Sequence, residues 1–521
     1  MKKLQHIFVT VCFILFVAFT ANAQFKINWG PTYQREGGMF SSFYLAGGDE
    51  NNYFMVMKPK KENNLLKFDF NHKLISTSPI NFKFNGEDLL LREFITTKSK
   101  TFGIFSNYDK KKNIFSIQAA QLEGGNFKPI KEVAVQPYKV QYKFIAGFGF
   151  GISGYTDEDA TGSFAISSNK NFVATIRTLS SKESGQADQI SVIVFDENMN
   201  MKWQKIQDFP YKDKKLDIQD FVVNNNGEVY LAITLDLPKK EKEKGLPYYN
   251  YQVVKITEND YKDYKLNLTG NNVISTAGLF ISPENNDIYV GGFCKDKDKL
   301  TDGDNSIFFS KLDITTGSLN SKVHPFSKEF LDGMVKNKKI EKGDGIVNFR
   351  IKDFVTFSDN SFSFIAEKSY VVTHTSSMNG RTSTTIIYHS DEIIIPRFDQ
   401  NGELKNLVKI DKEYGSTSPF TVSYSLGINN DKLFLLYNDS KSREEGAAEK
   451  KGGLFSMFSA KNLFTTFSVI DSKGKLETQE TIFNGSETDG MFCPYNSTQL
   501  GDKLLINILH GKNYHFGTLK L

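Results

Sequence analysis

Short apolar runs recur in pairs along this chain, with a loop between the two members and a tight turn after the second. The first members read YFMVM at 53, TFGIFS at 101, FVATI at 172, VYLAITL at 229, IYVGGF at 288, FSFIA at 362, LFLLY at 433 and LLINIL at 504. The second members read LLKFDF at 65, IFSIQAAQL at 114, ISVIVFD at 190, YQVVKIT at 251, IFFSKLD at 307, IIIPRFD at 393, TTFSVID at 465 and YHFGTLKL at 514. These runs are rich in β-branched and aromatic residues and are apolar on both faces or nearly so, which predicts β-strands that are covered on both sides.

Turn residues bracket each pair of runs. The second run ends near an aspartate, as in FDENMNM at 195, LDITTGSL at 312, FDQNGEL at 398 and IDSKGKL at 470. We expect Gly317, Gly402 and Gly474 to take positive φ in these turns. Asn, Asp and Gly also precede the first run of most pairs, so both ends of each pair are predicted to be hairpins.

The spacing of the pairs leaves room for one strand before and one after each pair. About eight four-stranded units result, at a period of roughly 60 to 70 residues. A seven-unit count stays open, because the strands of the second unit are the least apolar. The last unit stops after its third strand at Leu521, and residues 25–32 form an isolated strand-like segment. We therefore expect the amino-terminal segment to supply the missing outer strand and to close a ring.

This pattern resembles the β-propeller superfold, and the resemblance covers essentially the whole chain after residue 23. The Gly-His and Trp-Asp marks of WD repeats, the paired glycines of kelch repeats and the aspartate box of sialidases are missing, so no narrower family is indicated. The resemblance implies an all-β fold in which residues 24–521 form a single propeller domain.

The amino terminus predicts export. Lys2 and Lys3 precede the apolar run 7–19, and small residues lead to a predicted cleavage after Ala23. Residues 1–23 are therefore interpreted as a signal peptide, and the mature chain is expected to be periplasmic or secreted. Cys12 lies inside the apolar run, which argues against a lipoprotein anchor, and no later run is long enough for a membrane helix.

Composition excludes some partners. The 64 Lys and Arg fall to 62 without Lys2 and Lys3, against 60 Asp and Glu. Because these charges are interleaved along the chain, we do not expect nucleic acid as a partner. Cys294 and Cys493 lie in apolar runs of different units and are expected to be buried and unpaired.

The longest inserts fall between the two strands of a pair, at 177–189, 236–250, 294–306, 367–392 and 438–464. These loops are expected to share one face of the disc, which is where recognition would occur. Tyr248 and Tyr249 are candidate binding residues, with a loop anchored by these two packed rings as an equal alternative. A second candidate site, at Leu454, Phe455, Met457 and Phe458, could contact a partner groove or a membrane surface, although the favoured interpretation is that this cluster folds back over its blade.

No motif assigns a reaction, a metal or a cofactor. Asn379-Gly380 predicts that the insert 367–392 is a two-stranded arm, with His374 and His389 on opposite legs and no third metal ligand at a suitable spacing. The favoured hypothesis is a non-catalytic binding or scaffold propeller that recognises a protein or glycan. The alternative is a carbohydrate-active hydrolase or lyase with carboxylates in the central funnel, because such residues come from separate blades without a linear motif.

Overall fold

The computed structural model describes most of the chain after residue 25. The described residues are 26–34, 42–49, 51–58, 63–84, 86–98, 100–109, 114–137, 163–179, 189–211, 216–238, 241–242, 246–297, 303–334, 345–378, 381–440, 463–488, 490–510 and 513–521. The predicted signal peptide lies outside this set.

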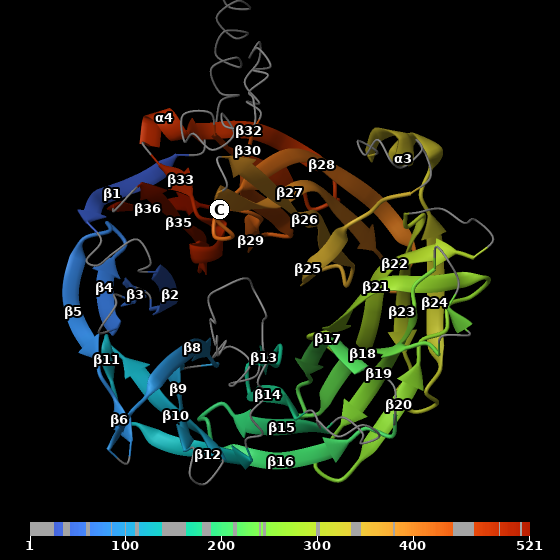
Figure 1. The fold of residues 1–521 in the computed structure, drawn as a ribbon, viewed down its shortest axis with the longest axis horizontal. Helices are drawn as coiled ribbons and strands as arrows, with labels where there is room; N and C mark the ends of the chain where they lie inside the picture. The colour runs from blue at the N-terminus through green and yellow to red at the C-terminus, as the bar shows by residue number, and fades with distance from the viewer. Residues whose placement is uncertain are drawn as a thin grey trace, which may run out of the picture.

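Eight antiparallel sheets stand around a central axis, each with its first strand innermost (Figure 1). The chain is an eight-bladed β-propeller. Blades 1 and 2 consist of β2 (Ser42–Gly48), β3 (Asn52–Lys58), β4 (Asn63–Asp69) and β5 (Leu74–Ile80), then β8 (Leu90–Thr96), β9 (Thr101–Asp109), β10 (Ile114–Glu123) and an outer strand in two pieces, β11 (Asn126–Phe127) and β12 (Lys131–Pro137). Blades 3 and 4 consist of β13 (Ser163–Ile166), β14 (Phe172–Leu179), β15 (Gln189–Asp196) and β16 (Met201–Asp208), then β17 (Leu216–Val223), β18 (Val229–Asp236), β19 (Tyr249–Ile256) and β20 (Tyr261–Lys265).

The second half of the ring repeats this order. Blades 5 and 6 consist of β21 (Asn272–Ile281), β22 (Ile288–Asp296), β23 (Ser306–Leu312) and β24 (Leu319–Pro325), then β25 (Phe349–Thr356), β26 (Phe362–Met378), β27 (Arg381–Phe398) and β28 (Leu404–Ser416). Blade 7 consists of β29 (Tyr424–Asn429), β30 (Lys432–Asp439), β31 (Phe464–Ile470) and β32 (Leu476–Asn484). Blade 8 has the short inner strands β33 (Met491–Phe492) and β34 (Thr498–Leu500), then β35 (Lys503–His510), β36 (Asn513–Lys520) and β1 (Ile27–Gln34).

Small elements lie in the connections. They are β6 (Lys83–Phe84), β7 (Glu87–Asp88), the helices α3 (Lys328–Met334) and α4 (Gly485–Thr488), and the 3₁₀ turn η4 (Pro494–Asn496). The expected count of eight is therefore confirmed, and the seven-bladed alternative is wrong because the weakly apolar second unit forms a full blade.

The core lies between blades. The middle strands are buried on both faces, as β18 illustrates with seven buried residues from Val229 to Leu235. One apolar cluster joins the middle strands of blades 3 and 4, with Val192 and Val194 packed in the same group as Leu231 and Ile233. Each blade thus buries a face that it could not bury alone, which explains the uninterrupted apolar runs.

The amino-terminal strand closes the ring, as expected. β1 pairs antiparallel with β36, with Ile27 opposite Leu519 and Gln34 opposite Asn513. Trp29 packs edge-on against Phe483 of blade 7, with ring centroids 5.6 Å apart. The hydroxyl of Tyr33 donates to the backbone carbonyl of His72 in blade 1 at 2.5 Å. β1 therefore completes blade 8 and also contacts both of its neighbours.

The aspartate turns have the predicted local structure. In FDQNGEL, the Asp399 carboxylate accepts from the backbone N–H groups of Asn401 and Glu403, both at 2.9 Å. Gly317, Gly402 and Gly474 have φ of +75°, +80° and +77°, as predicted. These compact turns leave the corresponding face of the disc with short connections.

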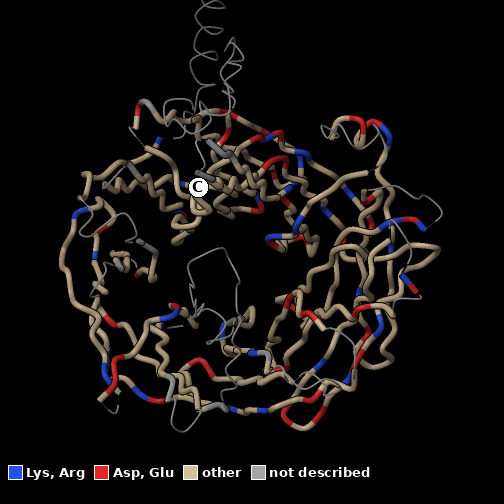
Figure 2. The backbone as a smooth tube through the Cα atoms, viewed as in Figure 1, with Lys and Arg blue, Asp and Glu red and all other residues tan. Residues whose placement is uncertain are grey.

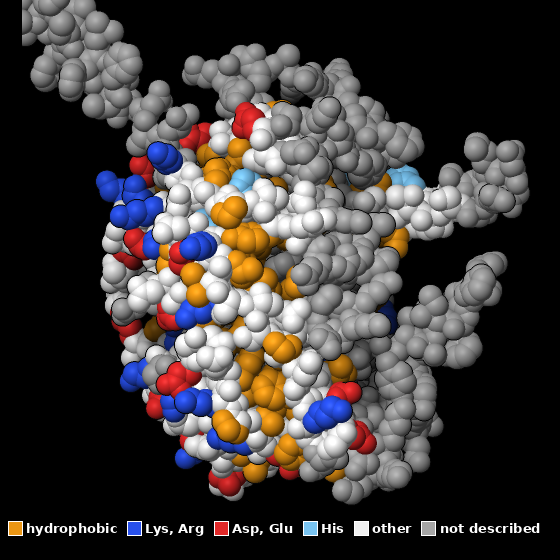
Figure 3. All heavy atoms as spheres, turned by 90° about the vertical axis from the view of Figure 1, so that its left-hand side faces the viewer, with side chains coloured by type: hydrophobic (Ala, Val, Ile, Leu, Met, Phe, Trp, Pro, Cys, Tyr) orange, Lys and Arg blue, Asp and Glu red, His pale blue; other side chains and the backbone are white. Residues whose placement is uncertain are grey.

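Charges are distributed around the whole ring. Figure 2 shows basic and acidic residues interspersed along the described backbone. In the view of Figure 3, acidic and basic side chains are mixed mainly toward the left, and apolar side chains form a band beside them. Cys294 and Cys493 are buried and unpaired, as expected.

Candidate functional site

The longer connections lie on one face of the disc, which we call the upper face. It carries the loops between second and third strands and the connections from one blade to the next. Asp304, between β22 and β23, forms a β-bridge with Ile346, which lies in the connection from blade 5 to blade 6. This pairing confirms that the two kinds of loop share a face.

Two exposed aromatic rings meet on the upper face. Phe420 lies in the connection from β28 to β29, and Tyr495 lies in η4 of blade 8. Their side chains are 44% and 71% exposed, the latter the largest exposure among the described large apolar residues. The ring centroids are 5.5 Å apart with an interplanar angle of 66°. We call this pair the aromatic platform.

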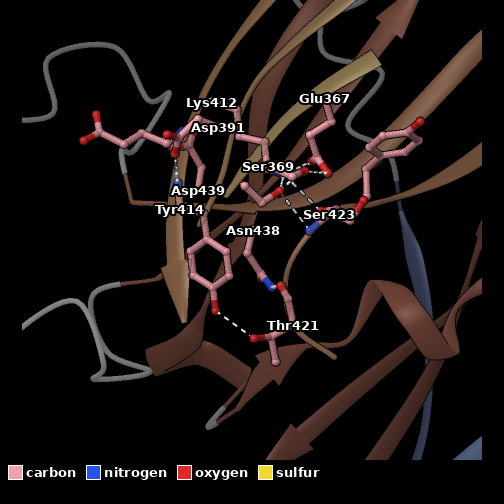
Figure 4. A network of polar contacts seen from close by, with 12 residues as sticks. Glu367, Ser369, Asp391, Lys412, Tyr414, Thr421, Ser423, Asn438 and Asp439 are labelled. Atoms are coloured by element: carbon pink, nitrogen blue, oxygen red, sulfur yellow. Dashed lines mark hydrogen bonds and ion pairs between the residues drawn. The ribbon is translucent and has the colours of Figure 1, made fainter. Parts of the chain in front are cut away.

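Buried polar groups hold the Phe420 side of the platform in place. The neighbouring residue Thr421 is fully buried, and its hydroxyl bonds Ser416 at 2.8 Å and Tyr414 at 3.2 Å. The side-chain amide of Asn438 donates to the carbonyls of Thr421 and Phe492, both at 2.8 Å. Figure 4 shows Tyr414 and Asn438 converging on Thr421 from separate strands. Because Phe492 belongs to blade 8, Asn438 joins the two halves of the platform.

The Tyr495 side is fixed from below and from the centre. The Ser425 hydroxyl, at the start of blade 7, donates to the carbonyl of Pro494 at 3.1 Å. Ser497 closes η4 by donating to the carbonyl of Cys493 at 3.0 Å. η4 lies against the innermost strands β2 and β29, so the platform stands at the inner edge of the disc. A loop whose backbone is fixed in this way loses little further freedom on binding.

The segments around the platform carry no charge. Residues 414–430 and 491–500 contain no Asp, Glu, Lys, Arg or His, and they are rich in Ser, Thr, Asn and Gln. The two segments that carry the exposed rings thus supply uncharged hydrogen-bonding groups.

A buried ion pair braces the same connection from blade 6. Lys412 and Glu367 are both fully buried, with Nζ and Oε1 2.5 Å apart. Lys412 also donates to the hydroxyl of Ser390 and, at 3.1 Å, to the carbonyl of Ser423 (Figure 4). Ser423 has φ of +74°, an uncommon value for a residue with a side chain.

Bulges in β27 and β28 lie next to the ion pair of Lys412 and Glu367. Against β26, β27 carries one extra residue between Ser390 and Ile393, and β28 carries one extra residue opposite Glu392. Bulges bend a strand and redirect a side chain. Here the bend coincides with the point where β26 and β27 leave the blade. The hydroxyl of Ser390 is buried, donates to Glu367 and accepts from the N–H of Ser423. The network of Glu367, Ser390 and Lys412 is therefore structural and braces the connection.

Titratable groups gather at the base of the projecting strands. Burial and the nearby charge of Glu392 raise the pKa of Asp391 to about 6. Asp391 accepts from the N–H of Tyr414 at 3.3 Å. Burial lowers the pKa of His389, which stacks flat on Tyr370 with ring centroids 4.6 Å apart.

Carboxylates also recur on the innermost strands. Glu93 of β8, Asp220 of β17 and Asp353 of β25 each directly follow a one-residue bulge. Desolvation by the surrounding protein raises the pKa of all three. Asp220 accepts from the N–H of Leu279 at 2.9 Å, and Asp353 accepts from the hydroxyl of Tyr424 at 2.6 Å. Two of these carboxylates therefore bond the next blade.

The predicted binding residues differ in their surroundings. Tyr248 is 47% exposed, with the ammonium of Lys242 5.4 Å from its ring centroid. Tyr249 is a packed anchor, because it stacks edge-on against Tyr251 at 5.6 Å and its hydroxyl donates to the carbonyl of Ser275 at 2.9 Å. Leu454, Phe455, Met457 and Phe458 lie outside the described residues.

The aromatic platform was not predicted. Phe420 and Tyr495 are single aromatic residues in polar loops 75 positions apart, and only the neighbouring positions of blades 7 and 8 bring them together. The uncharged character of both loops was the one sequence signal that could have paired them.

The two-stranded arm is confirmed by continuous pairing of β26 and β27 out to Met378 and Arg381. His374 and His389 stand on opposite legs, but His374 pairs with Thr385 and His389 with Tyr370, so they occupy different levels. Among the described residues, no group of three or more His, Cys, Asp or Glu is placed to hold a metal ion. The described helices include none long and apolar enough to cross a membrane.

No protein-family model matches the chain, and no curated protein sequence matches it. Several solved structures align with the chain at low sequence identity and low TM-score. An uncharacterised protein of Listeria monocytogenes is 9% identical over 83% of this chain and 94% of its own, with a TM-score of 0.38. The β-propeller domain of the Trilobed protease of Pyrococcus furiosus is 9% identical over 86% and 97%, with a TM-score of 0.35. An α-L-arabinanase of Penicillium chrysogenum is 8% identical over 73% and 98%, with a TM-score of 0.32.

Proposed function

We propose that the chain is an exported, non-catalytic binding propeller that holds a neutral glycan on its aromatic platform. The observation that carries the proposal is the pair of exposed rings of Phe420 and Tyr495, fixed by buried polar groups at the inner edge of the upper face. Export is proposed from the signal-like residues 1–23.

The chemistry of the platform favours a sugar over other ligands. The apolar C–H face of a pyranose packs against an aromatic ring, while its hydroxyls need neutral donors and acceptors around the ring. Residues 414–430 and 491–500 supply hydroxyl and amide groups and no charge. A charged ligand would find no counter-charge in these segments. Because the two rings are inclined at 66°, they suit two successive sugars of a twisted chain.

The experiment is affinity electrophoresis of the mature protein in gels containing starch, xylan or glucomannan. At least one polysaccharide is expected to retard the wild type. Tyr495→Ala and Phe420→Ala should each weaken the retardation by about tenfold or more, because truncating a central aromatic contact typically costs at least ~1.4 kcal/mol. Tyr248→Ala is the matched control, since Tyr248 is an exposed tyrosine on another loop of the same face.

The results of this experiment distinguish the platform from the Tyr248 loop as the binding site. Unchanged retardation of Tyr495→Ala, with the fold intact by circular dichroism, would refute the platform as the binding site. Loss of retardation in Tyr248→Ala alone would move the site to the loop before β19. If no neutral polysaccharide retards the protein, the proposal that its ligand is a neutral glycan is refuted.

A second candidate function, glycan hydrolysis, is favoured by the raised carboxyl pKa values of Glu93 and Asp353 on the innermost strands. A carboxyl group with a raised pKa can act as a general acid. In this case, reducing ends should appear when the polysaccharide is incubated with the wild type and should not appear with Glu93→Gln. Retardation without product release in the wild type would contradict the enzyme and leave the binding proposal standing.

A further inference from the structure

The strands β26 and β27 extend well beyond the blade that they belong to. They contain 17 and 18 residues, whereas β30 and β31 of the next blade contain 8 and 7. β25 pairs with β26 only up to Lys368, and β28 pairs with β27 only back to Tyr388. Among the described residues, the two strands pair only with each other beyond these points, and we call this part, from Ser369 to Ile387, the arm.

One edge of β26 in the arm carries backbone groups that have no partner in the part of the chain that the structure describes. The N–H of Ser369 donates to the carbonyl of Asn348, on the β25 side, at 2.9 Å. Backbone direction alternates along a strand, and pairing with β27 is regular from Ser369 to Met378. The N–H and C=O groups of Val371, Thr373 and Thr375 therefore point away from β27. The last β25 partner lies below them, so these groups form an open ladder.

The side chains along this edge do not protect it. Natural edge strands are usually blunted by lysine, proline, a bulge or shortness. The segment 369–378 reads SYVVTHTSSM, which contains no Lys, Arg, Asp, Glu or Pro, and it is free of bulges. Val371 is 57% exposed, and Ile386, which faces the same side from β27, is 46% exposed. The arm therefore presents an exposed, uncharged and β-branched edge.

We propose that the β26 edge of the arm pairs with the same edge of a second copy of this chain. Only an extended polypeptide offers donors and acceptors at the spacing of an open ladder. In an antiparallel pair centred on Thr373, Val371 of each copy would lie opposite the position of Thr375 in the other, so that β-branched side chains meet and no like charges do. The β26 edge of one arm is therefore complementary to the same edge of a second arm.

The geometry of the arm allows this arrangement. Residues 369–378 extend about 30 Å at ~3.3 Å per residue. Because both arms leave from an upper face, antiparallel pairing places the two upper faces opposite each other, with the arms side by side between them. Two such strands bury well below the roughly 800 Å² per partner of a standard interface, so we expect a reversible dimer with a dissociation constant in the micromolar range.

Sedimentation velocity of the mature chain from about 1 to 200 µM tests the proposal. The wild type should shift from monomer to dimer over this range. Thr373→Pro removes an outward N–H without removing a bond to β27, since Thr373 and Ile386 form a non-hydrogen-bonded pair. This variant should dimerise at least tenfold more weakly. Val371→Lys, which places a charge on the edge, should do the same.

Thr385→Lys is the control. Thr385 pairs with His374 from β27, so a lysine at this position adds the same charge to the arm but away from the open edge of β26. It should dimerise like the wild type, as should Tyr495→Ala, whose platform is a separate feature. Hydrogen exchange in residues 369–377 should slow with rising protein concentration. A wild type that stays monomeric throughout the range would overturn the proposal. Dimerisation of folded Thr373→Pro at wild-type strength would overturn it as well.

Discussion

Replacing Lys412 with methionine removes the cation from a fully buried network. The ammonium group contacts the Glu367 carboxylate at 2.5 Å, the hydroxyl of Ser390 and the carbonyl of Ser423. Methionine fills a similar volume but leaves a buried carboxylate without its cation. Breaking one side of a buried pair costs about 3–5 kcal/mol, and we expect Lys412→Met to lower the free energy of unfolding by that amount at pH 7.

The pH dependence gives this prediction a second readout. Burial opposes the charged form of Glu367, but the neighbouring Lys412 ammonium outweighs it and holds the pKa of Glu367 below its ordinary value. In the wild type this contribution is present above the unfolded pKa of about 4.3 and is lost as the pH falls through the folded pKa. Without Lys412, burial alone should raise the pKa of Glu367. The variant should then recover stability, relative to the wild type, as the pH is lowered from 7 to about 4.5.

Calorimetric unfolding at pH 7 and pH 5 measures both effects. A chain of this size has an unfolding entropy near 1 kcal/mol per degree, so the loss corresponds to a Tm decrease of about 3–5 °C at pH 7. Lys409→Met is the matched control on the same strand. Lys409 pairs with the exposed residue Asp411 at 2.7 Å, so its loss should cost less than about 1 kcal/mol. If Lys412→Met shifts Tm no more than Lys409→Met, or if its deficit is the same at both pH values, the network does not stabilise the fold as argued.

Two further substitutions test neighbouring features. The pKa of Asp391 is raised to about 6, so its contribution to stability is present below the unfolded pKa near 4 and is lost as the pH rises through 6. Asp391→Asn should therefore flatten the decline in Tm between pH 5 and pH 7. An unchanged profile would show that another group causes the decline. A Cβ on Gly517 would lie 2.6 Å from Cε3 of Trp29, so Gly517→Ala should cost about 1–3 kcal/mol and speed hydrogen exchange in β1. Gly333→Ala, in an open helical position, is its control, and equal effects would contradict the crowding argument.

The scaffold was predictable because its signals are local. The Asp399 turn is set by hydrogen bonds within five residues, and Gly402 supplies the left-handed position within that same turn. The middle strands are buried on both sides, so their apolar runs need no alternating pattern. Closure by β1 also followed from the sequence, since a last unit with three strands needs a fourth.

The candidate site depends on contacts that the sequence does not display. Phe420 and Tyr495 meet only because blades 7 and 8 are neighbours, and Asn438 joins their loops from a third position. Lys412 reads as one more surface lysine, because the bulge that turns it inward to Glu367 depends on strand register. Tyr248 and Tyr249 looked equivalent, but only the packing of Tyr249 on Tyr251 shows that one of them is an anchor.

The ring joined through β1 and β36 underlies every placement above, and a disulfide trap tests it most directly. Gln34 and Asn513 are direct partners in the register of β1 and β36. Gln34→Cys combined with Asn513→Cys should oxidise rapidly to an intramolecular disulfide, visible as a mobility shift on a non-reducing gel, while Cys294 and Cys493 stay buried. Gln34→Cys combined with Lys520→Cys, seven residues away on the same strand, should not. Equal crosslinking of the two pairs, or none in the first, would contradict a ring closed by the amino-terminal strand.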